Sequence, residues 1–418
     1  MSMETELFTA ALGLQPPWSV RQVDFDPNAG RIDFLLAFER GHHFDCPACG
    51  AAKQSVHDTR PRQWRHLNFF QFQAFIKANL PRTRCASCGK TAQVPAPWAR
   101  EGSGFTLMFE ALALTLAREM PVAAIARTFK LGDDPLWRML GHHVDKARAA
   151  EDHSNVNRVG VDETATRRGQ NYISVFHDLD AGRVLFATEG RDQSTIERFA
   201  ADLQAHGGDP AAIADVCTDL SKAYIAGTAA HLPNATLSFD PFHVIALAST
   251  AVDEVRREEV KSEASLKGTR YIWIKDASKW NRRQLTEHYH LSRTRLKTAR
   301  AWRIKEELRD IFATADNATE AQSRLSRWYS WARRSRLKPF KRLALTIKDH
   351  LHGILRHFDS GLSNGRVESI NSLLQAAKAR ARGYRRVESF ITMAYLIAGK
   401  LRALPVCPMM AAKPVAAV

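Results

Sequence analysis

Three acidic residues lie in short segments of small and polar residues, at positions suited to chemistry. Asp162 occurs in "GVDET", Asp219 in "CTDLSKAY" and Glu368 in "SNGRVESINS". Carboxylate oxygens are the ligands that Mg²⁺ prefers, and this ion leaves coordination positions free for phosphate. Two such ions close together activate water and stabilise the leaving oxygen of a phosphodiester. The three acids therefore predict a two-magnesium site that acts on nucleic acid.

Each acid also has a simpler interpretation. Asp162 is followed by Glu163, and alternation along a strand directs only one of the two inward. Asp219 could serve only to cap the helix that follows it. Glu368 could be a carboxylate that the helix dipole favours in a first turn. The metal site is the interpretation that accounts for all three together.

The expected helix that carries Glu368 is followed by a run of basic residues. Asn364 is a candidate N-cap, and Asn371 lies one turn beyond Glu368 along the same face. The segment from residue 378 to residue 386 then has no acidic residue. We expect its basic side chains to bind DNA: Lys378, Arg380, Arg382, Arg385 and Arg386.

Two CxxCG motifs, "CPACG" and "CASCG", predict a zinc site. The predicted ligands are Cys46, Cys49, Cys85 and Cys88. Four thiolates leave no open coordination position, so the zinc would be structural. The alternative is a pair of tight turns that hold ordinary buried thiols, and the zinc module could also bind RNA or protein instead of DNA.

The charge of the chain indicates a polyanionic partner. The 418 residues include 60 Lys and Arg against 44 Asp and Glu, which gives a net charge of +16, and a field of this sign attracts nucleic acid. We find no long apolar run that would span a membrane. The N-terminal "MSMETELFTA" lacks the features of a signal peptide, so we expect an intracellular protein with reduced cysteines.

The first 150 residues predict a zinc module followed by a helix-turn-helix. Strands are expected at 31–38 and 68–80, and the basic segment "RPRQWRH" between them either contacts phosphates through Arg62 and Arg65 or forms a solvated hairpin edge. "PVAAIARTFKLGDDPLWRMLGHHV" predicts two short helices, the second capped by Asp133 or Asp134. The inward residues would be Trp137, Leu140 and Val144, with Arg138, His142 and Lys146 outward. Arg127, Lys130 and Arg138 are the candidate DNA contacts, although a plain helical hairpin has the same pattern.

From residue 156 the pattern changes to that of a mixed α/β domain. Three strands, a helix, a strand, a helix and a strand are expected at 157–164, 172–180, 182–190, 194–207, 211–219, 220–232 and 235–240. This order is typical of a ribonuclease H-like domain. Residues 241 to about 350 are helical, basic and rich in tryptophan, which suits nucleic-acid contact by stacking, although most of these tryptophans would serve equally as core residues.

The expected fold class is thus multidomain α/β, with a ribonuclease H-like catalytic domain that has a long helical insertion and follows the zinc module and the helix-turn-helix. The expected divisions are a zinc-binding module at 1–100, a helix-turn-helix region at 101–152, the first part of the catalytic core at 153–245, the insertion at 246–350, the final part of the core at 351–404 and a tail at 405–418.

These motifs together resemble the ISL-three family of bacterial DDE-type insertion-sequence transposases. The resemblance covers nearly the whole chain and includes the two CxxCG motifs with "RQWRHL" between them, "GVDET", "TDLSKAYIAG", "FDPFHV", "KGTRYIW" and "SNGRVESINS". It implies that Asp162, Asp219 and Glu368 form the catalytic triad, with Asp162 contacting both magnesium ions. Asp240 and His243 in "DPFHV" would support the site. Ser369 stands where the family usually has glycine after the glutamate.

The resemblance further implies a transposase that binds the terminal inverted repeats of its insertion sequence, cleaves the DNA strand and joins the released 3′-hydroxyl to a target. The partners would be double-stranded DNA, from transposon ends and target, and a second copy of the chain or more. The location would be the bacterial cytoplasm, in association with the nucleoid. The alternatives are a transposase-derived regulator that binds DNA without catalysis, and a ribonuclease H-like structure-specific nuclease or junction resolvase.

Overall fold

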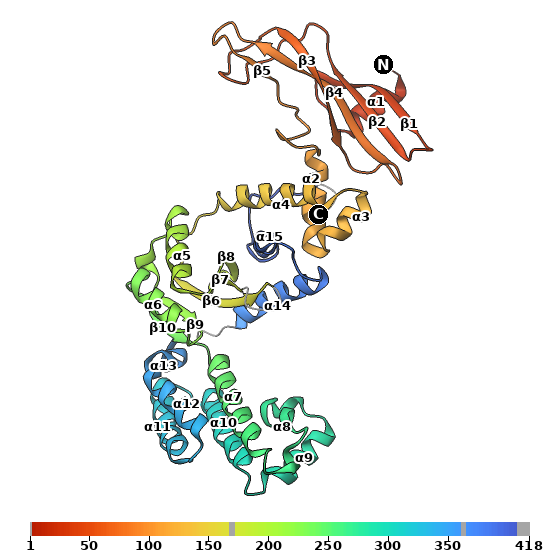
Figure 1. Cartoon of the computed structure of the whole chain (residues 1–418). Helices are drawn as coiled ribbons and strands as arrows, with labels where there is room; N and C mark the ends of the chain where they lie inside the picture. Colours follow the sequence, from red (N-terminus) through yellow and green to blue (C-terminus); the bar gives the residue numbers. More distant parts are fainter. Residues whose placement is uncertain (1, 167–171, 361–364, 408–418) are drawn as a thin grey trace, which may run out of the picture. The chain divides into compact units, whose positions relative to one another are not determined.

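The computed structural model describes residues 2–166, 172–360 and 365–407 (Figure 1). The chain forms two compact units. The first contains the residues up to 150 together with 377–382 and those from 401 onward. The second contains residues 151–376 and 383–400. No helix within the described ranges is both long enough and apolar enough to cross a membrane.

The first unit begins with a helix and a five-stranded sheet. Their bounds are α1 Met3–Ala11, β1 Trp18–Asp26, β2 Arg31–Phe38, β3 Val56–Arg65, β4 Gln73–Arg84 and β5 Thr91–Gln93. The sheet order is β1-β2-β4-β3, with β5 paired to β4. Trp18, Trp64 and Trp98 pack edge to face in its core. The strand expected at 68–80 begins only at Gln73, because Phe69 and Phe72 bridge a tight turn in which Phe70 has a positive φ of 51°.

Three helices follow in the order expected of a helix-turn-helix: α2 Leu107–Glu119, α3 Val122–Phe129 and α4 Asp133–Arg148. Leu140 and Val144 are buried and Trp137 is half-buried, whereas Arg138, His142 and Lys146 are exposed, as predicted. The predicted aspartate cap is wrong. The N-cap position of α4 is Gly132 and makes no side-chain cap bond, so Asp133 and Asp134 lie inside the first turn, where the helix dipole favours their charge.

A buried glutamate ties this region together. Glu110 of α2 is fully buried and accepts hydrogen bonds from Arg100 Nε at 3.0 Å, Ser103 Oγ at 2.5 Å and His143 Nε2 at 2.6 Å. Burial favours the neutral acid, but the hydrogen bonds from His143 and Ser103 and the charge of Arg100 hold the pKa of Glu110 below its ordinary value. The network therefore fixes α2, α4 and the segment before α2 to one another.

We expect Glu110→Gln to lower the free energy of unfolding of this unit by about 3 kcal/mol, because it leaves the basic partners of a buried carboxylate uncompensated. Since the folded-state pKa is lowered, the wild-type contribution is present above the unfolded pKa of about 4.3 and is lost as the pH falls through the folded pKa. Urea denaturation followed by tryptophan fluorescence tests this. Glu119→Gln, at an exposed position of the same helix, is the control, and an equal effect of both substitutions would contradict the role of the network.

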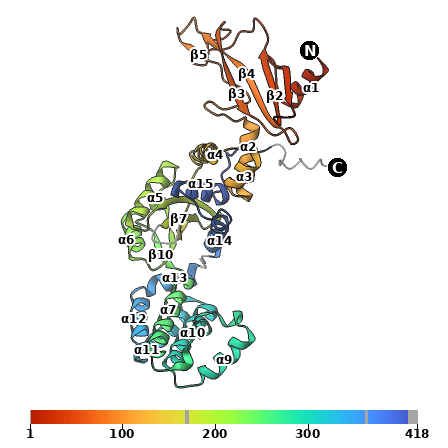
Figure 2. The ribbon, with the colours of Figure 1, turned by 45° about the vertical axis from the view of Figure 1, so that its right-hand side comes forward.

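The second unit contains a mixed sheet flanked by helices on both faces (Figures 1 and 2). The bounds are β6 Arg158–Ala165, β7 Tyr172–Asp178, β8 Arg183–Glu189, α5 Gln193–Ala205, β9 Asp215–Thr218, α6 Lys222–His231 and β10 Thr236–Phe239. The order β10-β9-β6-β7-β8, with β9 and β10 parallel to β6 and the other pairs antiparallel, confirms the ribonuclease H-like core. The strand expected at 211–219 is shorter, because Pro210–Ala212 form a 3-10 turn.

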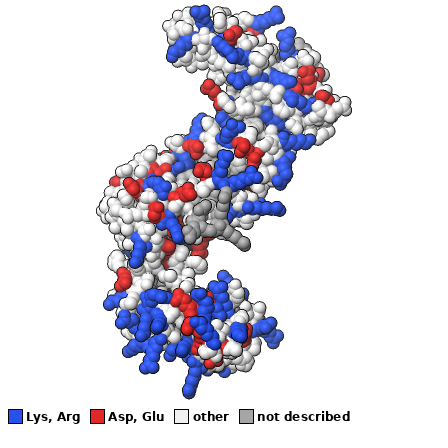
Figure 3. Space-filling model, in the orientation of Figure 1, with Lys and Arg blue, Asp and Glu red and all other residues white. Residues whose placement is uncertain are grey.

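The helical insertion lies between β10 and the last two helices of this unit. Its bounds are α7 Pro241–Glu259, α8 Arg270–Ile274, α9 Arg282–Ser292, α10 Lys297–Thr314, α11 Ala318–Arg334, α12 Lys338–Asp349 and α13 Leu351–Ser360, with short 3-10 turns at Ala264–Leu266 and Ala277–Lys279. α14 Gly365–Arg380 and α15 Val387–Ala398 follow the insertion. The surface of the insertion is rich in Lys and Arg (Figure 3).

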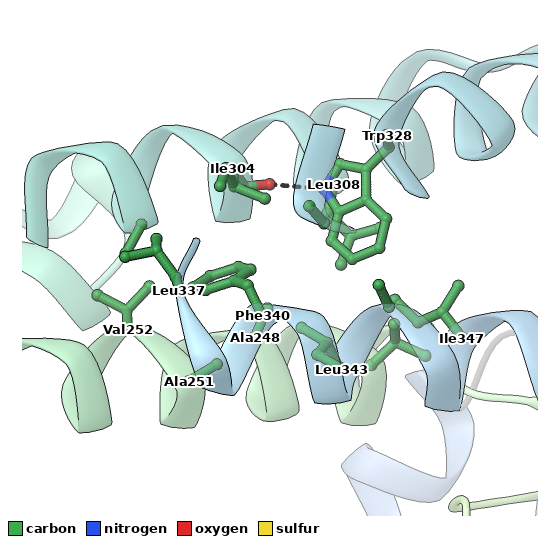
Figure 4. Close-up of a cluster of buried hydrophobic side chains, with 14 of the residues drawn as sticks. Ala248, Ala251, Val252, Ile304, Leu308, Trp328, Leu337, Phe340, Leu343 and Ile347 are labelled. Carbon is green, nitrogen blue, oxygen red and sulfur yellow. Dashed lines mark hydrogen bonds between the residues drawn. The ribbon is translucent and has the colours of Figure 1, made fainter. Parts of the chain in front are cut away.

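The insertion has its own hydrophobic core, built from α7, α10, α11 and α12 (Figure 4). Trp328 is 1% exposed, and its Nε1 donates to Ile304 O at 2.8 Å. Trp273 is also fully buried, and its carbonyl accepts from the buried ammonium of Lys305 at 2.7 Å. These two tryptophans are therefore core residues, whereas Trp331 is 38% exposed.

Candidate functional site

The two neighbouring acids of β6 face opposite sides of the sheet. On one side, Val159 and Val161 pack with residues of α5 and α6, and Glu163, which alternation places on the same face, lies near Tyr224 of α6 and interacts with it. On the other side, Asn371 of α14 donates to Asp162 Oδ2. Gln375 of α14 likewise donates to Thr164 Oγ1. Asp162 is thus the residue that faces the helix of Glu368, which the sequence pattern left open.

The surroundings of Asp162 are crowded with negative charge. Burial raises the pKa of Asp162, and the carboxylates of Asp219 and Asp240 raise it further. The N–H of Glu163, which donates to Asp162 Oδ1 at 2.7 Å, and His243 act in the opposite direction. A divalent cation would neutralise this concentration of carboxylates, and their oxygens are the donors that Mg²⁺ prefers. The residues present therefore fit a divalent metal.

Asp219 follows directly after β9 and lines a cavity. Its Oδ1 accepts from Ser221 N at 3.0 Å, so it does take part in the turn that begins α6. One carboxylate oxygen remains available for other contacts. The cavity beside it has a volume of about 470 Å³ and is lined also by His243 of α7 and Arg342 of α12. This cavity could not be predicted from the sequence, because His243 and Arg342 are almost a hundred residues apart along the chain.

Asp240 and His243 lie at the start of α7. Asp240 is 6% exposed, and its Oδ1 accepts from Phe242 N at 3.0 Å as the N-cap of the helix. His243 Nε2 lies 3.9 Å from Asp240 Oδ2. Both side chains act electrostatically on Asp162, so they are neighbours of the candidate site.

Glu368 is an exposed residue in the first turn of α14, three positions before Asn371. The adjacent Val367 is fully buried against Leu179 and Cys217. A Cβ added to Gly160 of β6 would lie 2.8 Å from both Val367 Cγ2 and Leu179 Cδ2. The missing side chain of Gly160 is therefore what allows α14 to approach the strand that carries Asp162.

Asn364 lies outside the described residues. Within those described, Asp162, Asp219 and Glu368 do not form a set whose ligand atoms all lie within 4.8 Å of one another. Asp219 and Asp240 act electrostatically on Asp162, and Glu368 lies on the helix whose Asn371 donates a hydrogen bond to Asp162.

The four predicted zinc ligands do come together. Their sulfurs all lie within 4.8 Å of one another, with Cys46 Sγ 3.9 Å from Cys88 Sγ and Cys49 Sγ 3.6 Å from Cys85 Sγ. Tetrahedral zinc with bonds near 2.3 Å separates its sulfurs by about 3.8 Å. The thiols shift one another's pKa in opposite directions: the backbone N–H of Cys88 lowers the pKa of Cys85 to about 6, whereas, against the N–H of Ala51, the side chains of Cys88 and Cys85 raise the pKa of Cys49 to about 12. Distances and donors both fit zinc.

A second cluster of metal-binding residue types was not predicted. His153, Asp202 and His206 have ligand atoms within 4.8 Å of one another, at the end of α5. The two rings stack with centroids 4.7 Å apart and planes at 27°, and His206 Nδ1 bonds Asp202 O at 2.7 Å. An ion bound to an imidazole lies in the ring plane, along the nitrogen lone pair. Two stacked rings cannot readily bind the same ion in this way. We therefore interpret the cluster as a stacked histidine pair, in which His206 is also hydrogen-bonded to Asp202.

One predicted DNA contact is contradicted by the structure. Arg65 is 3% exposed, and its guanidinium donates to the carbonyls of His66 and Ala74 and to Asn68 Oδ1. It holds β3 and β4 together and is not available to a phosphate. The other candidate contacts are exposed or half-buried: Arg62, Arg127, Lys130, Arg138, Lys378, Arg380, Arg382, Arg385 and Arg386.

Three family models match consecutive parts of the chain. Residues 43–88 match the zinc-finger of transposase IS204/IS1001/IS1096/IS1165, residues 94–144 match the helix-turn-helix domain of transposase family ISL3, and residues 159–394 match the DDE-type transposase of the same family. The helix-turn-helix match indicates DNA binding, and the DDE match indicates the use of a divalent metal.

Individual proteins show the same relationship. The transposase for insertion sequence element IS1557 of Mycobacterium tuberculosis is 30% identical over 439 residues, which cover 96% of this chain and 97% of that protein. The transposase for insertion sequence element IS1001 of Bordetella parapertussis is 26% identical over 393 residues, with coverages of 91% and 95%. Among solved structures, the Drosophila P element transposase strand transfer complex matches with a TM-score of 0.40 and 11% identity, over 73% of this chain and 95% of that one. Because the DDE match spans more than half of the sequence and the relatives align along nearly all of it, the chain belongs to the ISL3 family of DDE transposases.

Proposed function

We propose that this transposase binds the terminal inverted repeats of its insertion sequence, cuts the DNA strand there and transfers the new end to a target, with Asp162, Asp219 and Glu368 as catalytic metal ligands. The observation that carries the proposal is the contact of Asn371 with Asp162, which brings the glutamate helix to the strand of the first acid. Two magnesium ions would supply the charge that activates water and stabilises the leaving oxygen.

The residues around the acids would position them. Asn371 holds one oxygen of Asp162 by a hydrogen bond, and the N–H of Glu163 holds the other. These two hydrogen bonds fix the orientation of the Asp162 carboxylate on a rigid strand. Asp240 and His243 would orient groups at the same edge, since Asp240 is locked as the N-cap of α7.

The first unit would recognise the element ends. Exposed Arg127, Lys130 and Arg138 of the helix-turn-helix and Arg62 of the zinc module would contact DNA, while structural zinc holds the module in shape. Synapsis of two element ends would require at least a homodimer, and action on element ends within chromosomal DNA would require a cytoplasmic protein at the nucleoid. We also propose the divisions 1–100, 101–152, 153–245, 246–350, 351–404 and 405–418.

The test is cleavage of a duplex that carries the element end and its flank, with purified protein and Mg²⁺. Discrete nicking by the wild type and none by Glu368→Gln is expected, while both bind the duplex equally. Binding without cleavage by both proteins would overturn the catalytic proposal and leave a DNA-binding regulator.

A further inference from the structure

The segment from residue 321 to residue 348, which covers nearly all of α11 and α12, contains no acidic residue. It carries nine basic residues: Arg324, Arg327, Arg333, Arg334, Arg336, Lys338, Lys341, Arg342 and Lys348. Such an excess of positive charge over 28 residues is unusual for two helices with a purely structural role.

The charges lie on one face of α12. Lys338, Lys341, Arg342 and Lys348 are exposed, whereas the opposite face packs into the core of the insertion through Phe340, Leu343, Ala344 and Ile347. From Lys338 to Lys348 the row is about 15 Å long. That length matches the rise of about four base pairs of duplex DNA.

Most of these charges are not neutralised. Arg324 pairs with Asp310 at 2.6 Å and Arg342 with Glu254 at 2.6 Å. The other seven form no ion pair with any residue that the structure describes: Arg327, Arg333, Arg334, Arg336, Lys338, Lys341 and Lys348. In Figure 3 this surface is the dense group of basic side chains over α11 and α12, in the lower part of the view.

The basic row is continuous with the candidate active site. The cavity of about 470 Å³ that Asp219 and His243 line has α12 as its other wall, through Arg342 and Thr346. A duplex whose phosphate lies at Asp219 can therefore continue along α12.

We propose that the exposed face of α11 and α12 binds the phosphate backbone of the DNA that flanks the element, on the far side of the cleavage point. This proposal rests on the proposed function. A cut at an element end has a transposon side of fixed sequence and a flank whose sequence differs at every insertion. A flank of arbitrary sequence can be held only through its backbone, and Lys and Arg are the side chains that do so.

The test compares two variants with the same change of charge. The first is Lys338→Gln with Lys341→Gln and Lys348→Gln. The control is Lys261→Gln with Lys267→Gln and Lys279→Gln, at exposed positions elsewhere in the insertion. Affinity is measured against NaCl concentration for two duplexes, one with the element end plus flank and one that stops at the cleavage point.

On the duplex with the flank, we expect the plot of log association constant against log NaCl concentration to be less steep for the α12 variant, by about 2.7 in slope. At 0.15 M NaCl this variant should bind roughly 10- to 100-fold more weakly than the wild type. On the duplex without the flank, it should match the wild type, and the control should match on both. Equal losses on both duplexes would mean that the surface holds the element itself, and no loss would mean that it does not bind DNA. Either result overturns the proposal. If the wild type binds but never nicks, the proposed function fails instead, whatever the slopes.

Discussion

Asp162→Asn is expected to lower the rate of magnesium-dependent cleavage by more than about 100-fold, the upper range for loss of a residue that only supports a metal ligand. Asparagine keeps the size of the side chain but removes the charge that, in the proposed site, would hold a cation beside the carboxylates of Asp219 and Asp240. Single-turnover nicking of an end-plus-flank duplex measures the effect, with DNA affinity measured in parallel to show that binding is retained.

The matched control is the next residue. Glu163→Gln changes the same charge on the same strand, but on the face toward Tyr224 of α6. We expect it to retain activity within about 10-fold. If Glu163→Gln were inactive and Asp162→Asn active, the metal would lie on the α5 and α6 side of the sheet, and the proposed triad would be wrong.

Removal of zinc should unfold the zinc module. Structural zinc contributes about 10–16 kcal/mol in small zinc domains, which is comparable to the whole free energy of unfolding of an ordinary domain, about 5–15 kcal/mol. Cys85→Ser, or treatment with a chelator, should therefore abolish zinc content, expose residues 43–88 to protease and abolish binding to the element ends. Metal analysis, limited proteolysis and a binding assay measure these three effects.

Cys407→Ser is the control for this experiment, because Cys407 is a buried thiol that lies outside the cluster of four. The Cys407→Ser protein should retain its zinc content and its affinity for the element ends. A metal-free Cys85→Ser protein that resists protease and binds ends as the wild type does would contradict a structural role for zinc.

Elements with strong local patterns could be predicted from the sequence. The strand at 31–38 was predicted to the residue, and the alternation that predicts β6, β7 and β8 is confirmed within two residues at each boundary. The two CxxCG motifs predicted a cluster that the structure brings together. The strand patterns depend only on neighbouring residues, and each CxxCG motif identifies its own two ligands locally, although the two motifs lie far apart in the chain.

Features that depend on distant partners could not be predicted. Arg65 stands in a basic, aromatic segment that suits phosphate contact, but its backbone pairs with Gly104 and Phe105 and its guanidinium is enclosed. For Asp162 and Glu163, alternation shows only that the two face opposite ways. Which of them faces the glutamate helix depends on α14, about two hundred residues later.

The close packing of Val367 over Gly160 has a consequence for the order of events during synthesis. Strand β6 with Asp162, and β9 with Asp219 directly after it, leave the ribosome before the whole insertion, and α14 follows only after the insertion. A nascent chain that ends before residue 365 has the sheet but lacks Val367, Asn371 and Glu368. If these residues complete the site as proposed, the growing or truncated chain cannot cut DNA, and only a finished polypeptide acquires this potentially harmful activity.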